Sequence, residues 1–130
     1  MTHFLPNQIV CLTHDSVYLY AEIIQHVTQR ACCWARPLAI ATAIDPGANP
    51  QDIGGSGWTW QDLRETSDLL LPDRLFREAM DTEVLPLMVR LYQTEDKPQE
   101  MLSPRPKQQL HQFIHQLYQA YPEYFVKNEQ

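Results

Sequence analysis

The chain has 130 residues, 44% of them hydrophobic, and a formal net charge of −6 at pH 7. This length is typical of one domain, so we expect a single domain over residues 1–130. The Lys and Arg residues are scattered singly, which argues against nucleic-acid binding and against docking on an anionic membrane.

The sequence predicts a cytoplasmic protein. No apolar run reaches the ~18–20 residues that a membrane-spanning helix needs. The N-terminal residues 1–10 lack the charged region and the long apolar region of a secretory signal. The odd number of cysteines fits a reducing compartment.

The first third of the chain is the most prone to form strands. Residues 8–14 predict a short strand, and 15–16 predict a turn. Residues 17–27 alternate in β-branched and aromatic side chains and predict a second strand, although their length also permits a helix. After a short connection at 28–30, residues 31–41 predict the third strand of an antiparallel meander.

Two features concern the third strand of the meander and the loop that follows it. Pro37 has no N–H for a ladder, so the third strand should be an edge or should break there. The connection 41–58 is rich in Pro and Gly, and such a long loop is typical of either function or disorder. Trp58 then begins a fourth extended segment that can run to 62–64.

The second half of the chain predicts three helices, over 73–80, 83–93 and 106–121. Pro72 suits the first turn of the first helix, and Asp81 or Thr82 can cap the second, with Pro86 in its first turn. Apolar residues cover most of 83–93, so this helix should be deeply buried.

The last predicted helix follows a polar, proline-bearing linker at 94–106 and should end at Pro122. Its glutamines fall mostly on the solvent-exposed side. Its apolar stripe comprises Leu110, Phe113, Ile114, Leu117 and Tyr121.

We expect no metal and no cofactor. His111 and His115 are four residues apart on a helix, a spacing that can present two imidazoles to a metal, but Gln112 stands where the zincin pattern needs Glu. The glycine-rich segment 54–57 lacks the Lys of a phosphate cradle and reads as a flexible loop.

The cysteines predict buried thiols rather than a nucleophile. Cys32 and Cys33 are adjacent and point to opposite faces of a strand, so they cannot chelate together. Cys11 can lie across the sheet from one of them, and Arg30 and Arg36 are close in sequence. Since no convergent acid–base pair is evident, we expect a protein that is not an enzyme.

The tryptophans and the acidic residues suggest a binding surface. Trp34 should belong to the core, whereas Trp58 and Trp60 share a strand face just past the long loop. We expect the sheet edge at Pro37 and the 41–60 loop to bind an extended tail, with Trp58 and Trp60 as anchors. Asp62 and Glu65, in a mixed-charge segment that otherwise reads as a solvated face, would favour a basic or neutral tail. The alternative is that both tryptophans only pack in the core.

Residues 60–88 and the strand pair Tyr20–Gln25 and Cys32–Leu38 resemble a small cyanobacterial family, the carboxysome assembly factors of the CcmS type. This resemblance implies an N-terminal β-meander followed by helices. It also implies a non-enzymatic activity, the binding of the C-terminal tail of a shell hexamer protein during shell assembly.

Three interpretations remain at this point. The first is an α+β adaptor or assembly protein, with an antiparallel sheet of three or four strands packed on about three helices. The second is a small barrel like the Sm or SH3 folds that binds a peptide or RNA, although the acidic balance argues against RNA. The third is an enzyme, which would require Cys32 or Cys33 beside a histidine.

Overall fold

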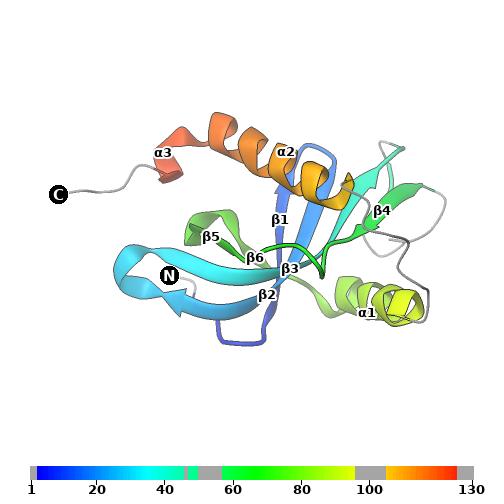
Figure 1. The fold of residues 1–130 in the computed structure, drawn as a ribbon, viewed down its shortest axis with the longest axis horizontal. Helices are drawn as coiled ribbons and strands as arrows, with labels where there is room; N and C mark the ends of the chain where they lie inside the picture. Colours follow the sequence, from blue (N-terminus) through cyan, green and yellow to red (C-terminus); the bar gives the residue numbers. More distant parts are fainter. Residues whose placement is uncertain (1–2, 46, 50–56, 96–104, 126–130) are drawn as a thin grey trace.

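The structure, a computed structural model, describes residues 3–45, 47–49, 57–95 and 105–125. Its fold is α+β, with one antiparallel sheet of six strands in the order β4-β3-β2-β1-β6, in which β5 also pairs with β3 (Figure 1). The strands are β1 (Ile9–His14), β2 (Val17–Val27), β3 (Cys32–Ala43), β4 (Trp58–Asp62), β5 (Leu69–Pro72) and β6 (Arg77–Glu78). The helices are α1 (Asp81–Glu95), α2 (Arg105–Ala120) and α3 (Pro122–Phe125), with 3-10 turns η1 (Thr28–Arg30) and η3 (Asp73–Leu75).

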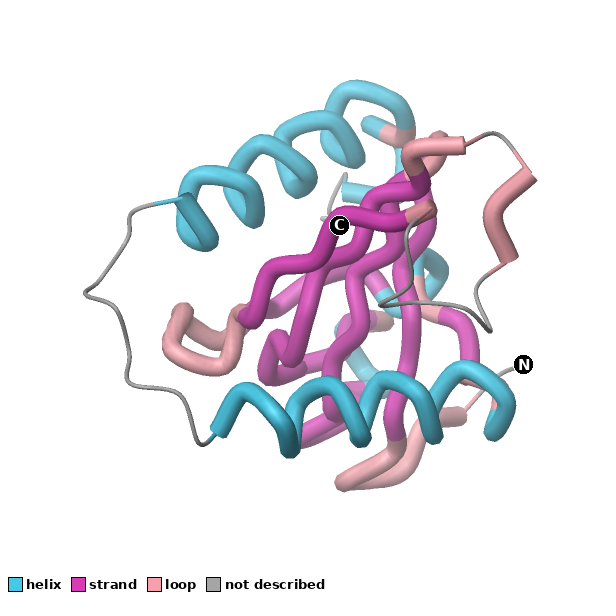
Figure 2. Tube along the Cα trace, turned by 90° about the vertical axis from the view of Figure 1, so that its right-hand side faces the viewer, coloured by secondary structure: helices cyan, strands magenta, loops and turns pink. Residues whose placement is uncertain are grey.

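The helices cover both faces of the sheet. Figure 2 shows α1 along one face and α2 along the other, with the strands between them. Two apolar clusters fill these spaces, and alternate residues of β2 contribute to each: Leu19 lies in the cluster under α2, whereas Tyr20 lies in the cluster under α1. The period-two pattern of 17–27 is therefore the pattern of a strand, because it feeds two separate cores.

The predicted meander is confirmed. β1, β2 and β3 pair antiparallel in sequence order, and Asp15, at φ 58°, occupies the left-handed conformation that the short turn requires. The 3-10 turn η1 makes the next connection, closed by Ala31 N–H donating to Thr28 O. The predicted helix of 106–121 is confirmed as α2, whose Leu110, Phe113 and Leu117 are buried.

The prediction that β3 is an edge or breaks at Pro37 is wrong for the strand as a whole, although its ladders are interrupted beside that residue. β3 lies inside the sheet, with β2 on one side and both β5 and β4 on the other. Pro37 falls in the gap between the residues paired with β5 and those paired with β4, and the register with β2 shifts beside it, at Leu38. The missing N–H is tolerated because the ladder is interrupted there, as at other strand bulges.

Residues 69–80 also differ from prediction. Over 73–80 the chain forms η3 and β6 in place of a helix. Together with β5, which precedes them, β6 raises the strand count from the expected three or four to six. Pro72 ends β5 rather than starting a helix, and Asp73 N–H donates to Ala31 O of the β2–β3 connection. Pairing with distant strands therefore outweighs the weak local helix pattern of 73–80.

Helix α1 begins two residues earlier than predicted. Its start is capped by the side chain of Glu83, which accepts a hydrogen bond from Met80 N–H at 3.0 Å, rather than by Asp81 or Thr82. Pro86 is the sixth helical residue, beyond the first turn. No helix in the described ranges is long and apolar enough to cross a membrane.

Candidate functional site

The edge strand β4 has backbone hydrogen-bonding groups that find no partner among the residues that the structure describes. Ile44 N–H donates to Gly57 O and Leu63 N–H donates to Leu38 O, which fixes the antiparallel register of β4 on β3. Because bonding alternates along an antiparallel pair, Thr59 and Gln61 direct their backbone groups toward β3. The backbone groups of Trp58, Trp60 and Asp62 face away from the sheet, and no described residue pairs with them.

The two tryptophans of this strand differ in exposure. Trp58 is 6% exposed, packs in the cluster under α1 and donates its indole N–H to Asn49 O at 3.2 Å, so its side chain belongs to the core. Trp60 is half-buried, and the Arg90 guanidinium lies 5.4 Å from its ring centroid. Trp60 Nε1 is buried and has no hydrogen-bond partner within the described ranges.

The predicted acidic residues have different roles. The Asp62 carboxylate is bound by Arg64, with 2.7 Å between Oδ2 and Nη2, and Arg64 Nη2 also donates to Leu91 O of α1. This ion pair ties the end of β4 to α1, so Asp62 is already engaged. Glu65 is exposed, three residues beyond the end of the strand.

The structure thus brings Trp58, Trp60 and Asp62 together on β4, with Glu65 nearby in the chain. Pro37 is different, because its side chain is fully buried and cannot touch a partner. Residues 46 and 50–56 of the predicted 41–58 loop lie outside the described residues, and so do residues 54–56 of the glycine-rich segment 54–57. Trp34, expected in the core, is 41% exposed and donates its indole N–H to Asp68 at 3.1 Å.

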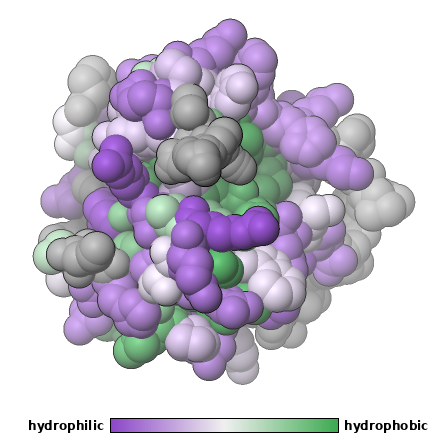
Figure 3. Space-filling view, turned by 90° about the vertical axis from the view of Figure 1, so that its left-hand side faces the viewer, coloured by the Kyte–Doolittle hydropathy of each residue, from purple (hydrophilic) through white to green (hydrophobic). Residues whose placement is uncertain are grey.

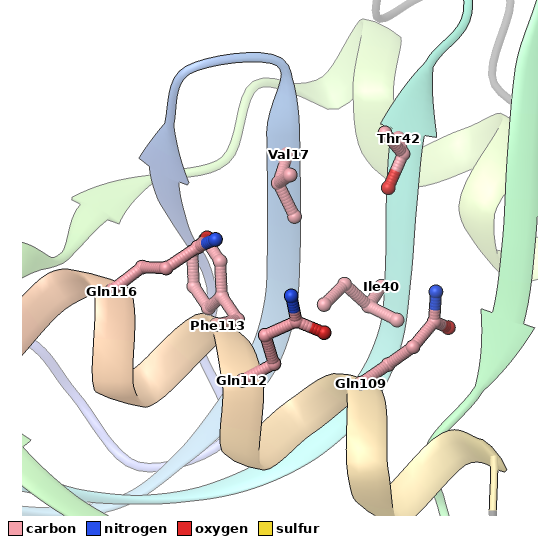
Figure 4. A pocket seen from close by; sticks show the side chains of 7 residues that line it. All are labelled: Val17, Ile40, Thr42, Gln109, Gln112, Phe113 and Gln116. Atoms are coloured by element: carbon pink, nitrogen blue, oxygen red, sulfur yellow. The ribbon is translucent and has the colours of Figure 1, made fainter.

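A small hollow next to β3, the neighbour of β4, was not predicted. It has a volume of about 180 Å³ and lies between α2 and the strands β2 and β3 (Figure 4). Its apolar lining is Val17, Ile40 and Phe113, and its polar lining is Thr42, Gln109, Gln112 and Gln116. Thr42 O accepts a hydrogen bond from Thr59 Oγ1 of β4 at 3.4 Å, so the hollow is one strand away from the free edge. The only hint of this hollow in the sequence is the spacing of the glutamines in 106–121. That spacing by itself predicts no more than the solvent-exposed face of a helix.

Cys11 and Cys33 are not placed as nucleophiles activated by a histidine. Burial raises the pKa of Cys11 to about 11, although the nearby Arg77 charge acts in the opposite direction. Burial, together with the Asp73 charge, raises the pKa of Cys33 to about 12. Such thiols are protonated near neutral pH, and thiolates are the reactive form.

His26 is the histidine paired across the ladder with Cys33, and both of its ring nitrogens are occupied. Phe4 N–H donates to His26 Nδ1 at 3.1 Å, so Nε2 carries the proton and donates to Asp73 Oδ2 at 3.0 Å. No ring nitrogen remains to accept the thiol proton. The arrangement fastens the N-terminal segment and η3 to the β2–β3 hairpin.

One buried carboxylate closes the opposite edge of the sheet. Glu83 is 4% exposed and accepts hydrogen bonds from Tyr20 Oη at 2.6 Å and from Arg77 at 2.9 and 3.0 Å. The hydrogen bond from Arg77 to Glu83 raises the pKa of Arg77, and burial raises the pKa of Tyr20. We call Tyr20, Arg77 and Glu83 the clamp, since it joins β2, β6 and α1.

His111 and His115 are both exposed on α2. Within the described residues no group of three His, Cys, Asp or Glu side chains is placed to hold a metal ion.

No protein-family model, curated protein or solved structure matches this chain. A proposal for its function therefore depends on the geometry of the β4 edge and on the resemblance of residues 60–88.

Proposed function

We propose that this chain is a non-catalytic cytoplasmic binding protein that takes up an extended segment of another protein along β4. The observation that carries the proposal is the set of outward backbone groups on Trp58, Trp60 and Asp62. An extended peptide that adds a strand to such an edge gains main-chain hydrogen bonds, and side-chain pockets beside the edge supply specificity.

Both faces of the edge support this mode of binding. Side chains of an added strand would alternate between the α1 face, beside Trp60 and Arg90, and the α2 face, beside Thr59 and Gln61. The glutamine-lined hollow lies on the α2 face and is large enough for a side chain with an apolar body and a polar tip. The net charge of −6 favours a basic or neutral segment.

The resemblance to CcmS-type proteins supports a specific partner, the C-terminal tail of a carboxysome shell hexamer. The test is fluorescence anisotropy with a labelled synthetic peptide of that tail and a scrambled peptide of the same composition. We expect the native tail to bind at least tenfold more tightly. Equal binding of the two peptides, or none, would reject this partner.

A proline substitution separates binding through the backbone from binding through the side chain. Trp60→Ala removes the indole only, whereas Trp60→Pro also removes the outward N–H and leaves the bonds between β4 and β3 in place. We expect both variants to fold, and the proline variant to bind the tail about fivefold to tenfold more weakly than the alanine variant, the effect of about one hydrogen bond. Equal affinities in the two variants would show that the partner does not pair with β4.

The topology of the sheet favours the adaptor proposal over the small-barrel alternative. The described part of the sheet is open, with β4 and β6 at its two ends and helices on both faces.

A further inference from the structure

The outer face of α1 carries a stripe of large apolar side chains. Leu85, Val89 and Tyr92 are 66%, 56% and 72% exposed, and Met88 is 39% exposed. Their spacing of three, four and seven residues places them on one side of the helix. We call these four residues the outer stripe.

The opposite side of the same helix is buried. Leu87 and Leu91 are 0% and 4% exposed in the cluster against the sheet. A helix that is apolar on both sides is typical of one packed between two partners, whereas among the described residues α1 has the sheet on one side only and forms the outermost layer on its face (Figure 2). The predicted deep burial of this helix is wrong for its outer half.

This stripe differs from ordinary exposed apolar residues, which occur singly. At the end of the molecule where α3 and the β2–β3 hairpin lie, apolar side chains show between hydrophilic ones (Figure 3). On α1 four large apolar side chains are neighbours on consecutive turns.

The charge pattern of α1 indicates what covers the stripe. From Thr82 to Gln93 no exposed residue of the helix is charged, and Arg90 is half-buried against the Trp60 ring. A charged partner surface would bury its charges against this stripe without compensation. A second copy of the same stripe brings no charge to the contact, and a twofold axis allows the same patch to serve on both copies.

We propose that the outer stripe is the contact surface of a homodimer in which two α1 helices pack antiparallel about a twofold axis. In this arrangement Met88 and Val89 lie at the axis, and Leu85 of each copy faces Tyr92 of the other. The antiparallel orientation opposes the two helix macrodipoles. A parallel orientation would place the two Asp81 carboxylates side by side.

The size of the stripe predicts a weak dimer. Four such residues expose an area of roughly 300–600 Å², less than the ~800 Å² that each partner buries in a standard interface. We therefore expect a dissociation constant above ~1 μM. Each copy carries a net charge of −6, so the dimer should strengthen when salt screens the repulsion.

Sedimentation equilibrium of the full chain tests the proposal, at protein concentrations from about 10 μM to about 1 mM and at low and high salt. The weight-average mass should rise from the monomer value of 15.2 kDa toward twice that value, and should rise further at high salt. A wild-type protein that stays monomeric at the highest concentration would overturn the proposal.

Matched variants locate the contact. Val89→Glu places a charge in the stripe and should weaken the dimer at least tenfold, whereas Gln93→Glu adds the same charge at the margin and should change it less than threefold. Tyr92→Ser provides a milder break if Val89→Glu unfolds by circular dichroism. Equal effects of Val89→Glu and Gln93→Glu, or a dimer that survives both stripe variants, would contradict this interface. Trp60→Pro alters no residue of the outer stripe and should change the dimer less than threefold, even though the Trp60 ring packs against Arg90 of α1.

Discussion

The two edges of the sheet differ in what they offer to another chain. At β6 the register places only the Glu78 backbone groups outward, and Arg77 Nη1 donates to the Glu78 carbonyl at 3.2 Å. At β4 three consecutive outward positions are unpaired within the described residues. Natural sheets protect their edges with short strands and charged side chains, and β6 has both devices. β4 is longer, and its outward positions carry no charged side chain before Asp62. This contrast indicates that pairing with another strand is prevented at β6 and permitted at β4.

The largest expected effect comes from opening the protected edge. Glu83→Gln removes the charge that holds Arg77 and Tyr20, and should cost about 3 kcal/mol of unfolding free energy, the low end for breaking a buried ion pair. The low end is expected because the Arg77 side chain is 42% exposed and can reach water. Urea denaturation measures this cost. The control, Glu78→Gln on the exposed neighbour, should change stability by less than about 0.5 kcal/mol.

The clamp also predicts in which direction the stability of the fold changes with pH. Burial alone would raise the pKa of Glu83, but hydrogen bonds from Arg77, Tyr20 and the Met80 N–H outweigh burial and hold this pKa below its ordinary value. A carboxyl group with a lowered pKa stabilises the folded state above its unfolded pKa, and this stabilisation is lost as pH falls through the folded pKa.

The stability difference between wild type and Glu83→Gln should therefore be constant above about pH 5 and should shrink in more acidic solution. Urea denaturation at several pH values measures it. A difference that grows on acidification would mean that Glu83 is protonated in the folded protein.

A smaller effect distinguishes inward from outward positions on β4. Gln61→Pro removes an N–H that bonds to β3 and leaves a carbonyl without its partner, so it should cost ~1–3 kcal/mol. Trp60→Pro, compared with Trp60→Ala to cancel the loss of the indole, should cost less than about 1 kcal/mol, because its N–H faces outward. Equal costs at the two positions would show that the register of β4 differs from the one described.

The smallest effect is a difference in thiol reactivity with no change in stability. Cys11 pairs with Arg77 of β6 and is buried, whereas Cys32 is half-buried. Brief alkylation near pH 8 followed by mass spectrometry should modify Cys32 first and spare Cys11, whose pKa is raised to about 11. Glu83→Gln should increase the labelling of Cys11. If Cys11 reacts as fast as Cys32 in the wild type, the β6 edge is more open than the structure indicates.

The sequence predicted the elements whose pattern is local and strong. The alternation in 17–27, the short turn at Asp15 and the apolar stripe of 106–121 each specify an element without reference to the rest of the chain. β5 and β6 could not be found in this way, because four and two residues carry no clear period and become strands only by pairing with β3 and β1.

The position of the sheet edge also depends on contacts between residues that are far apart in the sequence. Pro37 suggested an edge on β3, but residues 58–62 and 69–72 both return to pair with β3 and place it inside the sheet. Trp58 and Trp60 were correctly placed on one strand face, yet their different burial depends on how α1 packs beneath them. Which face of α1 contacts the sheet likewise follows from Leu87 and Leu91, and not from the overall apolar content of the helix.

The most direct test of the free β4 edge is amide hydrogen exchange of its residues, measured by NMR. In the free protein the amides of Thr59 and Gln61 should be protected by bonds to β3, whereas those of Trp60 and Asp62 should exchange much faster. Addition of a peptide that pairs with this edge should slow Trp60 and Asp62 selectively. Uniform protection along residues 59–62 in the free protein would contradict the account, because it would mean that the outward groups of β4 are already paired.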